Sequence, residues 1–490
     1  MRTHKLIGFF AFLCVLCASV VNLRAQETQP APGAPRSVSV PAIQEKKLPN
    51  GLTVATVERK GSPLVTVQLL IKSGSSAEDA SVAGLADMTA TMLTKGTTTK
   101  TASQVAESIE FLGATINSGA FWGGSFVSVT ATADKIDQAL AILADVVLRP
   151  KFAKSELDLL KTQSLDGLTY NLKQPSFLAN YVASNYAFGE HPVGGTPASI
   201  TALDERSVKN FYRSVFRPDN AVLIFAGDIS AVSANTLARK HFSGWKPAAH
   251  NSGGDAISVA GRRLSEADSR SKKILVIDLP NSGQASVIYA KKLDKGRLNG
   301  GGNHFYPAQT YNSVLGGGYS SRLNYEIRIK RGLSYGAGSS IQWRNFNANF
   351  ATRVQTKNES APEVVELILA EIRKIGTSKV DTDELTPRKA VLTGSFGRNL
   401  ETTSGLAVAI SDLYAFGTPT SELNRYMPNI SAVTAEQVQN FATDNTQNGN
   451  IIIVGDYSIF KDDLAKRFPG MKIDVIKADE LDLSKENLRK

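Results

Sequence analysis

The chain has 490 residues, of which 42% are hydrophobic and 20% charged, and its formal net charge is +10. This length exceeds what one compact core normally needs, so two or more domains are expected. The composition excludes a chain that is disordered throughout. The basic residues are scattered along the sequence without interleaved aromatic side chains, which argues against nucleic-acid binding.

The first 25 residues have the pattern of a secretory signal peptide. Arg2, His4 and Lys5 precede an apolar run over residues 6–21, and the small residue Ala25 ends the segment. The alternative is an uncleaved membrane anchor, but the run is shorter than the roughly 20 residues that span a bilayer. We therefore expect cleavage, export to the periplasm, and no membrane span in the mature chain.

Both cysteines, Cys14 and Cys17, lie in this segment, so the mature chain has neither a disulfide nor a thiolate zinc ligand. Cys17 follows the bulky Leu16, whereas lipid-modified cysteines follow a small residue, which argues against a lipoprotein. Cleavage would remove three basic residues and no acidic one, so the net charge would fall from +10 to +7.

After the signal, residues 26–45 are rich in Pro, Ala and Ser and predict a flexible tether. The spacing of apolar residues then predicts a first half in which strands alternate with helices. Strands are expected at 52–58, 64–72, 127–132 and 221–226, and helices within 81–113 and at 136–147 and 154–172. The last of these strands is followed by Gly227 and Asp228.

A second cycle of the same kind begins near residue 273. Strands are expected at 274–277, 285–290, within 338–355 and at 451–454, and helices at 306–315, 322–330, 361–376 and 383–398. The last strand again precedes a Gly-Asp pair, Gly455 and Asp456. The repeat of about 220 residues predicts an α+β fold of two homologous lobes, each a mixed, mostly antiparallel sheet packed against helices.

The boundaries of these lobes follow from composition. We expect an N-terminal lobe at 46–249, a polar, Gly/Ser-rich linker at 250–272 and a C-terminal lobe at 273–467. Residues 468–490 are rich in charge and are expected to form a loosely held tail.

The stretch GLADMTATMLTKGT at residues 84–97 resembles the signature helix of the pitrilysin and mitochondrial-processing-peptidase family, the inverzincins. The family pattern is close to G-x-A-H-x-x-E-H-M-x-x-K-G-T. Six flanking residues match it in register: Gly84, Ala86, Met92, Lys95, Gly96 and Thr97. In the family the two His bind zinc from one helix face, and the Glu takes a proton from zinc-bound water. The alternative is an unrelated helix that starts and stops at glycine.

The three chemical residues of that motif are missing here. Their positions hold Asp87, Ala90 and Thr91. The resemblance places the third ligand, a Glu, at Leu168 or Gly167, next to Asp166, and the five histidines form no H-x-x-E-H or H-x-x-x-H pair. A calcium site between Asp87 and Asp166 would have too few oxygens. We expect no metal in this chain.

Other segments resemble the family's first lobe in the right order. They are FLGA at 111–114, RPKF at 149–152, FGEHP at 188–192, and RPDN at 217–220 leading to Gly-Asp at 227–228. His191, within the third segment, is expected to be structural rather than catalytic.

The second lobe resembles the family at LGGGYSSRL, residues 315–323, and EIRIKRGLSY, residues 326–335. The glycine run lacks the G-K-[ST] ending of a phosphate loop. It predicts instead a tight turn before a helix capped by Ser320 or Ser321. In the family an Arg and a Tyr at the end of this signature reach the active chamber, which implies roles for Arg328 and Tyr335. The alternative is that both are ordinary surface or core residues.

The resemblance implies a function divided between two chains. In family members built from two subunits, each a half-clamshell, one carries H-x-x-E-H and zinc and the other the Arg and Tyr. This chain has the second set, which implies a non-metal-binding subunit that binds peptide and completes the site of a zinc-binding partner. The alternatives are an inert peptide-binding or scaffold protein on the same fold, and an autonomous peptidase with unconventional ligands.

Overall fold

The computed structural model describes residues 38–246, 273–485 and 487–490. The compact unit runs from Ser39 to Lys490. The predicted signal peptide, most of the tether and the predicted linker at 250–272 lie outside the described residues. None of the helices in the described ranges combines the length and the hydrophobicity of a membrane-spanning segment.

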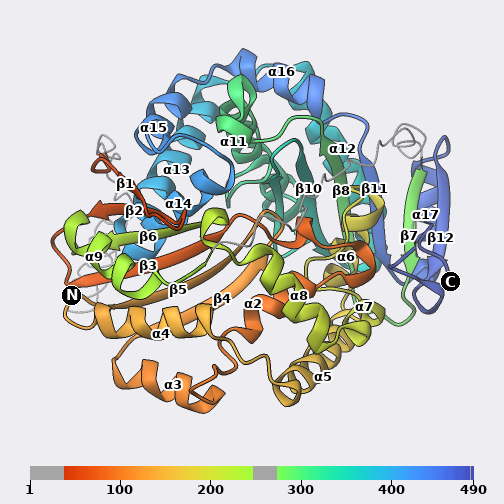
Figure 1. Ribbon diagram of the computed structural model, residues 1–490. Helices are drawn as coiled ribbons and strands as arrows, with labels where there is room; N and C mark the ends of the chain where they lie inside the picture. Colours follow the sequence, from red (N-terminus) through yellow and green to blue (C-terminus); the bar gives the residue numbers. More distant parts are fainter. Residues whose placement is uncertain (1–37, 247–272, 486) are drawn as a thin grey trace, which may run out of the picture. The chain divides into compact units, whose positions relative to one another are not determined.

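The first half of the unit is built on a six-stranded sheet (Figure 1). Its order is β1-β2-β6-β3-β5-β4, in which β2 and β6 are parallel and the other neighbours antiparallel. The strands are β1 Gln44–Lys47, β2 Thr53–Glu58, β3 Leu64–Ile71, β4 Thr115–Phe121, β5 Gly124–Thr132 and β6 Ala221–Gly227. The helices are α2 Leu85–Met92, α3 Ala102–Phe111, α4 Ile136–Leu148, α5 Lys154–Asn171, α6 Pro175–Tyr186, α7 Pro197–Ala202, α8 Glu205–Val215 and α9 Ala231–Phe242.

The second half is built in a similar way around a second six-stranded sheet, β12-β7-β11-β8-β10-β9, but its outer strand β12 comes last in the chain and pairs in parallel with β7. Its strands are β7 Lys273–Asp278, β8 Ala285–Leu293, β9 Ala337–Trp343, β10 Ala348–Thr356, β11 Asn450–Gly455 and β12 Lys472–Lys477. Its helices are α11 Phe305–Leu315, the π-helix η6 Asn324–Ile329, α12 Ala361–Thr377, α13 Thr382–Glu401, α14 Thr403–Ala415, α15 Glu422–Ala432, α16 Ala435–Asn445 and α17 Tyr457–Arg467. The predicted α+β fold of two related halves, each with a mixed, mostly antiparallel sheet, is confirmed.

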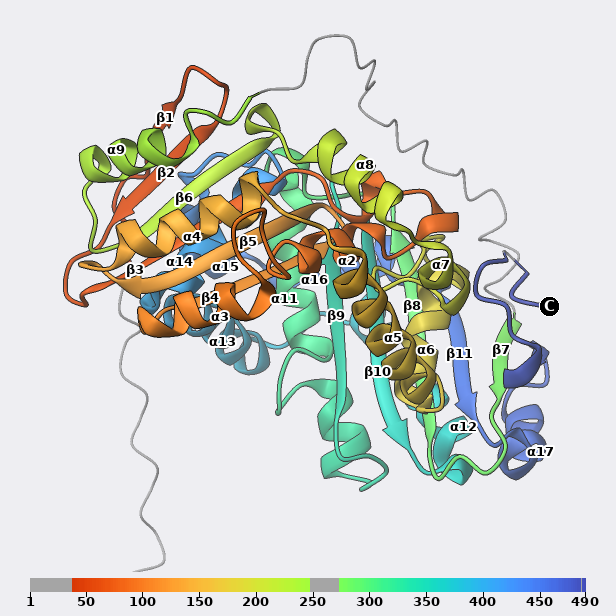
Figure 2. The same ribbon diagram turned by 60° about the horizontal axis from the view of Figure 1, so that its bottom comes forward.

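The two halves exchange a helix. One face of the first sheet packs on α2, α4 and α9 of its own half, while α14 of the second half packs against β3 and β6. In the same way α6 of the first half packs against β8 and β11 of the second sheet (Figure 2). α6 and α14 hold the same place in the two repeats. The central strands are therefore buried on both faces, which explains their nearly continuous apolar sequences.

Both ends of the unit differ from expectation. The segment 468–490 is not a loosely held tail throughout, because β12 pairs in parallel with β7, and Ile476 and Leu488 are buried. Its alternation of charged and apolar residues is that of an edge strand covered on one side. At the other end, the described part of the predicted tether is attached: the N–H of Val40 donates to Oδ1 of Asn424 at 2.8 Å.

Candidate functional site

Helix α2 carries the positions of the degenerate zinc motif. It begins after Gly84, whose φ of 92° is left-handed, and a Cβ there would come within 2.9 Å of the Cα of Gly195. This start therefore requires glycine. Leu85, Met88 and Met92 anchor the helix in the core of the first half. The helix ends at Met92, so the matched residues Lys95, Gly96 and Thr97 lie beyond it.

Only one of the three motif positions carries a strong metal-binding group. Asp87 is partly buried, the N–H of Ala120 donates to its Oδ1 at 3.4 Å, and burial raises the pKa of its carboxyl group. Ala90 is fully buried, and its methyl group can neither bind a metal nor move a proton. Thr91 offers a neutral hydroxyl, a poor ligand for zinc.

The expected position of the third ligand is equally unsuited to a metal. Leu168 is buried, Gly167 has no side chain, and Asp166 is exposed on α5. Across the described ranges, no three His, Cys, Asp or Glu side chains are grouped closely enough to hold a metal ion. The family's zinc therefore does not fit the residues at this place in the fold.

A buried carboxyl group that the sequence did not point to caps α2. The N–H of Gly84 donates to Oε1 of Glu78 at 2.8 Å, and the N–H of Ala86 donates to Oε2 at 2.5 Å. Burial raises the pKa of Glu78 to about 8, and the two backbone donors oppose this rise only in part. His191 Nδ1 lies 3.7 Å from Oε1, and its ring packs 5.1 Å from that of Trp122. Because burial lowers the pKa of His191, its neutral form is favoured.

The glycine run at 316–318 forms the predicted tight turn. A Cβ on Gly316 would come within 2.3 Å of the backbone nitrogen of Ser339, and one on Gly317 within 2.8 Å of Cα of Ser313. These two glycines allow the backbone of β9 and α11 to approach closely, whereas Gly318 faces open space. The expected serine cap takes another form, since the hydroxyl of Ser321 donates to the carbonyl of Gly318 at 2.6 Å.

The predicted helix at 322–330 is mostly a π-helix, η6, a rare form that often occurs at functional sites. Its start is fixed by Arg322, whose Nε and Nη2 donate to the two carboxylate oxygens of Glu384 at 2.8 and 2.7 Å. Oδ1 of Asn324 accepts from the N–H of Ala337 at 3.2 Å, which ties η6 to β9. The end of η6 carries Arg328.

Arg328 and Tyr335 lie together on the surface. The guanidinium carbon of Arg328 is 4.7 Å from the centre of the Tyr335 ring and 5.1 Å from that of Tyr319, a residue the sequence had not singled out. Such cation–π contacts hold an arginine in place and leave its N–H donors free. We call these three residues the Arg–Tyr cluster. Tyr335 is 90% exposed, and in the described structure its hydroxyl has no hydrogen-bond partner.

The loop between η6 and β9 holds Tyr335 outward. The N–H of Gly332 donates to the carbonyl of Arg328 at 3.0 Å, and the hydroxyl of Ser334 donates to the carbonyl of Gln355 at 2.6 Å. The structure thus joins the two residues that the resemblance singled out. It does not connect them to α2, because within the described ranges no hydrogen bond, ion pair or ring contact links the Arg–Tyr cluster to that helix.

Two sequence profiles of one peptidase family match this chain. The profile described as insulinase (peptidase family M16) matches residues 53–188, and that described as the peptidase M16 inactive domain matches residues 202–392. Together they cover about two thirds of the chain. The chain belongs to peptidase family M16, the insulinase and pitrilysin family.

Some relatives of the chain are named as proteases and others as non-peptidase proteins. It is 25% identical to an uncharacterized zinc protease of Rickettsia felis, covering 79% of this chain and 91% of the relative. It is 24% identical to a non-peptidase homolog of Helicobacter pylori, covering 79% and 87%. The crystal structure of a peptidase M16 inactive domain from Pseudomonas fluorescens matches with a TM-score of 0.72 and 25% identity, covering 84% of this chain and 98% of that one.

Proposed function

We propose that this chain is the exported, periplasmic, non-metal-binding subunit of a heterodimeric zinc endopeptidase that acts on peptides. The observation that carries the proposal is the contrast between the two halves. On α2 the positions of the zinc ligands hold Asp87, Ala90 and Thr91. In the second half Arg328 and Tyr335 remain in contact, with Arg328 partly buried and Tyr335 exposed. A zinc-binding homologous subunit would supply the metal.

Arg328 and Tyr335 have complementary roles in this proposal. The guanidinium of Arg328 presents several N–H donors in a fixed plane, which suits the carbonyl oxygens of a peptide main chain. The hydroxyl of Tyr335 would donate to the oxygen that gains negative charge when the partner's site attacks the peptide bond. A donor held in place before the reaction is worth more than one that must reorient. The contacts of Arg328 with the rings of Tyr319 and Tyr335 hold these donors in place.

The second candidate is a catalytically inert peptide-binding or scaffold protein on the same fold. It is favoured by the relative named a non-peptidase homolog and by the solved structure titled an inactive domain. Under this candidate the chain would bind peptide but would not raise the activity of any zinc peptidase.

Reconstitution distinguishes the two candidates. The purified chain is mixed with the purified zinc-binding M16 homologue of the same organism, and cleavage of an unstructured peptide is followed with each chain alone and with both. The proposal expects activity well above that of the zinc chain alone, and zinc bound by the partner only. No gain on mixing supports the inert candidate. Cleavage by this chain alone, abolished by a chelator, contradicts both.

A further inference from the structure

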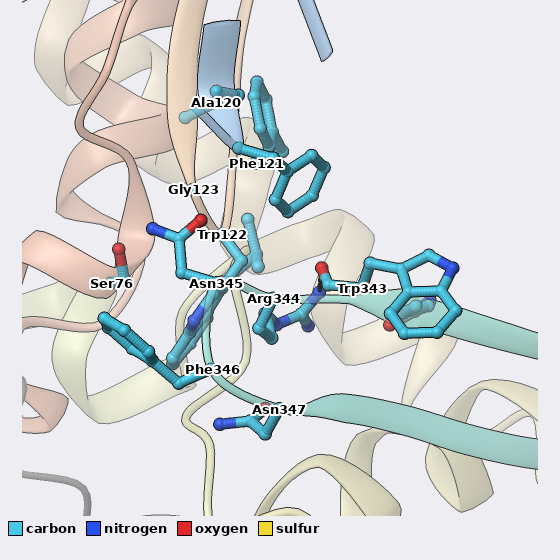
Figure 3. Close-up of a pocket in the computed structure, with 14 residues that line it drawn as sticks. Ser76, Ala120, Phe121, Trp122, Gly123, Trp343, Arg344, Asn345, Phe346 and Asn347 are labelled. Atoms are coloured by element: carbon cyan, nitrogen blue, oxygen red, sulfur yellow. Dashed lines mark hydrogen bonds between the residues drawn. The ribbon is translucent and has the colours of Figure 1, made fainter. Parts of the chain in front are cut away.

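A cavity of about 370 Å³ lies where two hairpin turns meet. One turn joins β4 to β5 and contributes Phe121 and Trp122; the other joins β9 to β10 and contributes Trp343 and Phe346. The end of α14 adds Phe416. Figure 3 shows the two turns around the same space. We call this cavity the hairpin pocket.

The hairpin pocket is framed by a buried ion pair that connects the halves. Nε and Nη2 of Arg344 donate to the two carboxylate oxygens of Glu190 at 3.1 and 2.8 Å, and Nδ2 of Asn349 donates to the same carboxylate at 2.8 Å. The guanidinium of Arg344 also lies 5.3 Å from the ring centre of Trp122. The one charged residue that lines the pocket is thus already neutralised, so the pocket favours an uncharged, apolar occupant.

The volume limits the size of that occupant. Sites for small molecules typically enclose about 300 to 1,000 Å³, and this cavity is near the lower end. It suits one bulky apolar side chain with its neighbouring peptide groups. Asn345 and Asn347, which also line the cavity, supply amide groups of the kind that recognise peptide groups. Phe346, 72% exposed, stands at the rim and can close over such a side chain.

Strand β9 connects the hairpin pocket to the Arg–Tyr cluster. The strand begins two residues after Tyr335 and ends at Trp343 in the pocket. Eight residues of extended chain separate them, about 25 Å. Addition of a peptide strand along the first part of this edge is blocked, because the outward N–H groups of Ala337 and Ser339 already donate to Asn324 and Gly316. A peptide held at the cluster therefore needs a second anchor farther along.

We infer that the hairpin pocket is this second anchor, a site for a bulky, uncharged side chain located about seven to nine residues from the peptide bond at Tyr335. The inference rests on the proposed function for the location of that bond. The pocket itself requires only that the chain binds unfolded peptide.

The test uses the chain alone. Two of its three tryptophans, Trp122 and Trp343, line the pocket, and the third, Trp245, is buried elsewhere. A Trp245→Phe variant therefore reports on the pocket by tryptophan fluorescence, and calorimetry on the unchanged chain gives the same affinity without that substitution. The probes are two unstructured Gly/Ser/Ala peptides of about 24 residues that differ only in one Phe or Ala at the centre, so that the chain on either side of this residue is long enough to reach Tyr335.

We expect the Phe peptide to bind at least about tenfold more tightly than the Ala peptide, as for burial of most of a phenyl group. Phe346→Ala should reduce the affinity for the Phe peptide by about three- to tenfold. The matched control is Phe111→Ala, which removes a 91% exposed phenyl group on α3 and should change nothing. Equal binding of the two peptides, or unchanged affinity in Phe346→Ala, would overturn the inference.

The outcome is independent of reconstitution. Selective binding of the Phe peptide without any gain of activity on mixing supports the pocket as a peptide-binding site and contradicts the partner-subunit proposal. A gain of activity that is the same for both peptides keeps the proposal and contradicts the pocket.

Discussion

Replacing Glu190 by alanine leaves the guanidinium of Arg344 buried without its counter-ion. The side chains of Arg344 and Glu190 are only 14% and 7% exposed, and the pair is bidentate. Removing one partner of such a pair typically costs about 3 to 5 kcal/mol, because the remaining charge stays desolvated. The carboxylate also accepts from Asn349, so that donor loses its partner as well. We therefore expect the free energy of unfolding to fall by at least about 3 kcal/mol.

The assay is urea unfolding, followed by circular dichroism and by tryptophan fluorescence. Glu436→Ala is the matched control, because it breaks a 3.5 Å pair with Lys379 in which both side chains are more than 60% exposed. This pair should contribute at most about 1 kcal/mol. A second variant, Glu190→Ala with Arg344→Met, removes both charges and should recover most of the loss. A loss in Glu190→Ala no larger than in Glu436→Ala would refute the view that a buried ion pair holds the hairpin pocket together.

Three further results are expected. Because the native carboxyl of Glu78 keeps its proton up to about pH 8 whereas the unfolded one releases it near 4.5, the native state binds more protons between these values. Stability should thus fall as pH rises through that window, by up to about 1.4 kcal/mol per unit, and Glu78→Gln should flatten the curve measured by urea unfolding at pH 5 to 8. Deleting residues 472–490 removes β12 from the edge of the second sheet and exposes the apolar surface that Ile476 and Leu488 cover. The free energy of unfolding should fall by about 3 to 6 kcal/mol, whereas an unchanged melting temperature would mean that this segment is a loosely held tail. In the reconstituted complex, Arg328→Lys keeps the charge but loses the planar donors, so kcat/KM should fall about tenfold; full activity would assign Arg328 no contact with substrate.

The sequence predicted the fold wherever the apolar pattern was local. Helix α4 was expected at 136–147 and lies at Ile136–Leu148, because its apolar residues recur at helical spacing on the buried face. Strand β4, Thr115–Phe121, was missed because it is an edge strand without a buried residue and its apolar residues do not alternate. Strand β12 was hidden by its charges. The exchange of α6 and α14 depends on contacts between distant segments, which local patterns do not encode.

The candidate site, like the fold, was predicted only in part from the sequence. Arg328 and Tyr335 were found through the resemblance, and the structure brings them together. Tyr319, the third member of the cluster, lies nine residues before Arg328. A turn and most of a π-helix separate the two residues, so no helical or strand spacing predicts their contact. Glu78 was missed because a carboxylate in a loop before a helix looks like a solvated residue until its burial is known. The hairpin pocket joins segments that are more than 200 residues apart in the sequence.

If this chain completes a zinc site held by another subunit, as we claim, catalysis depends on the hydroxyl of Tyr335, which Tyr335→Phe removes. The substitution removes one exposed hydroxyl, and Tyr170→Phe, at a 67% exposed tyrosine on α5, is the matched control. In the complex with the zinc-binding homologue, kcat for an unstructured peptide should fall about a hundredfold in Tyr335→Phe, with KM, complex formation and zinc content unchanged. A kcat equal to that of the Tyr170→Phe complex would contradict the claim.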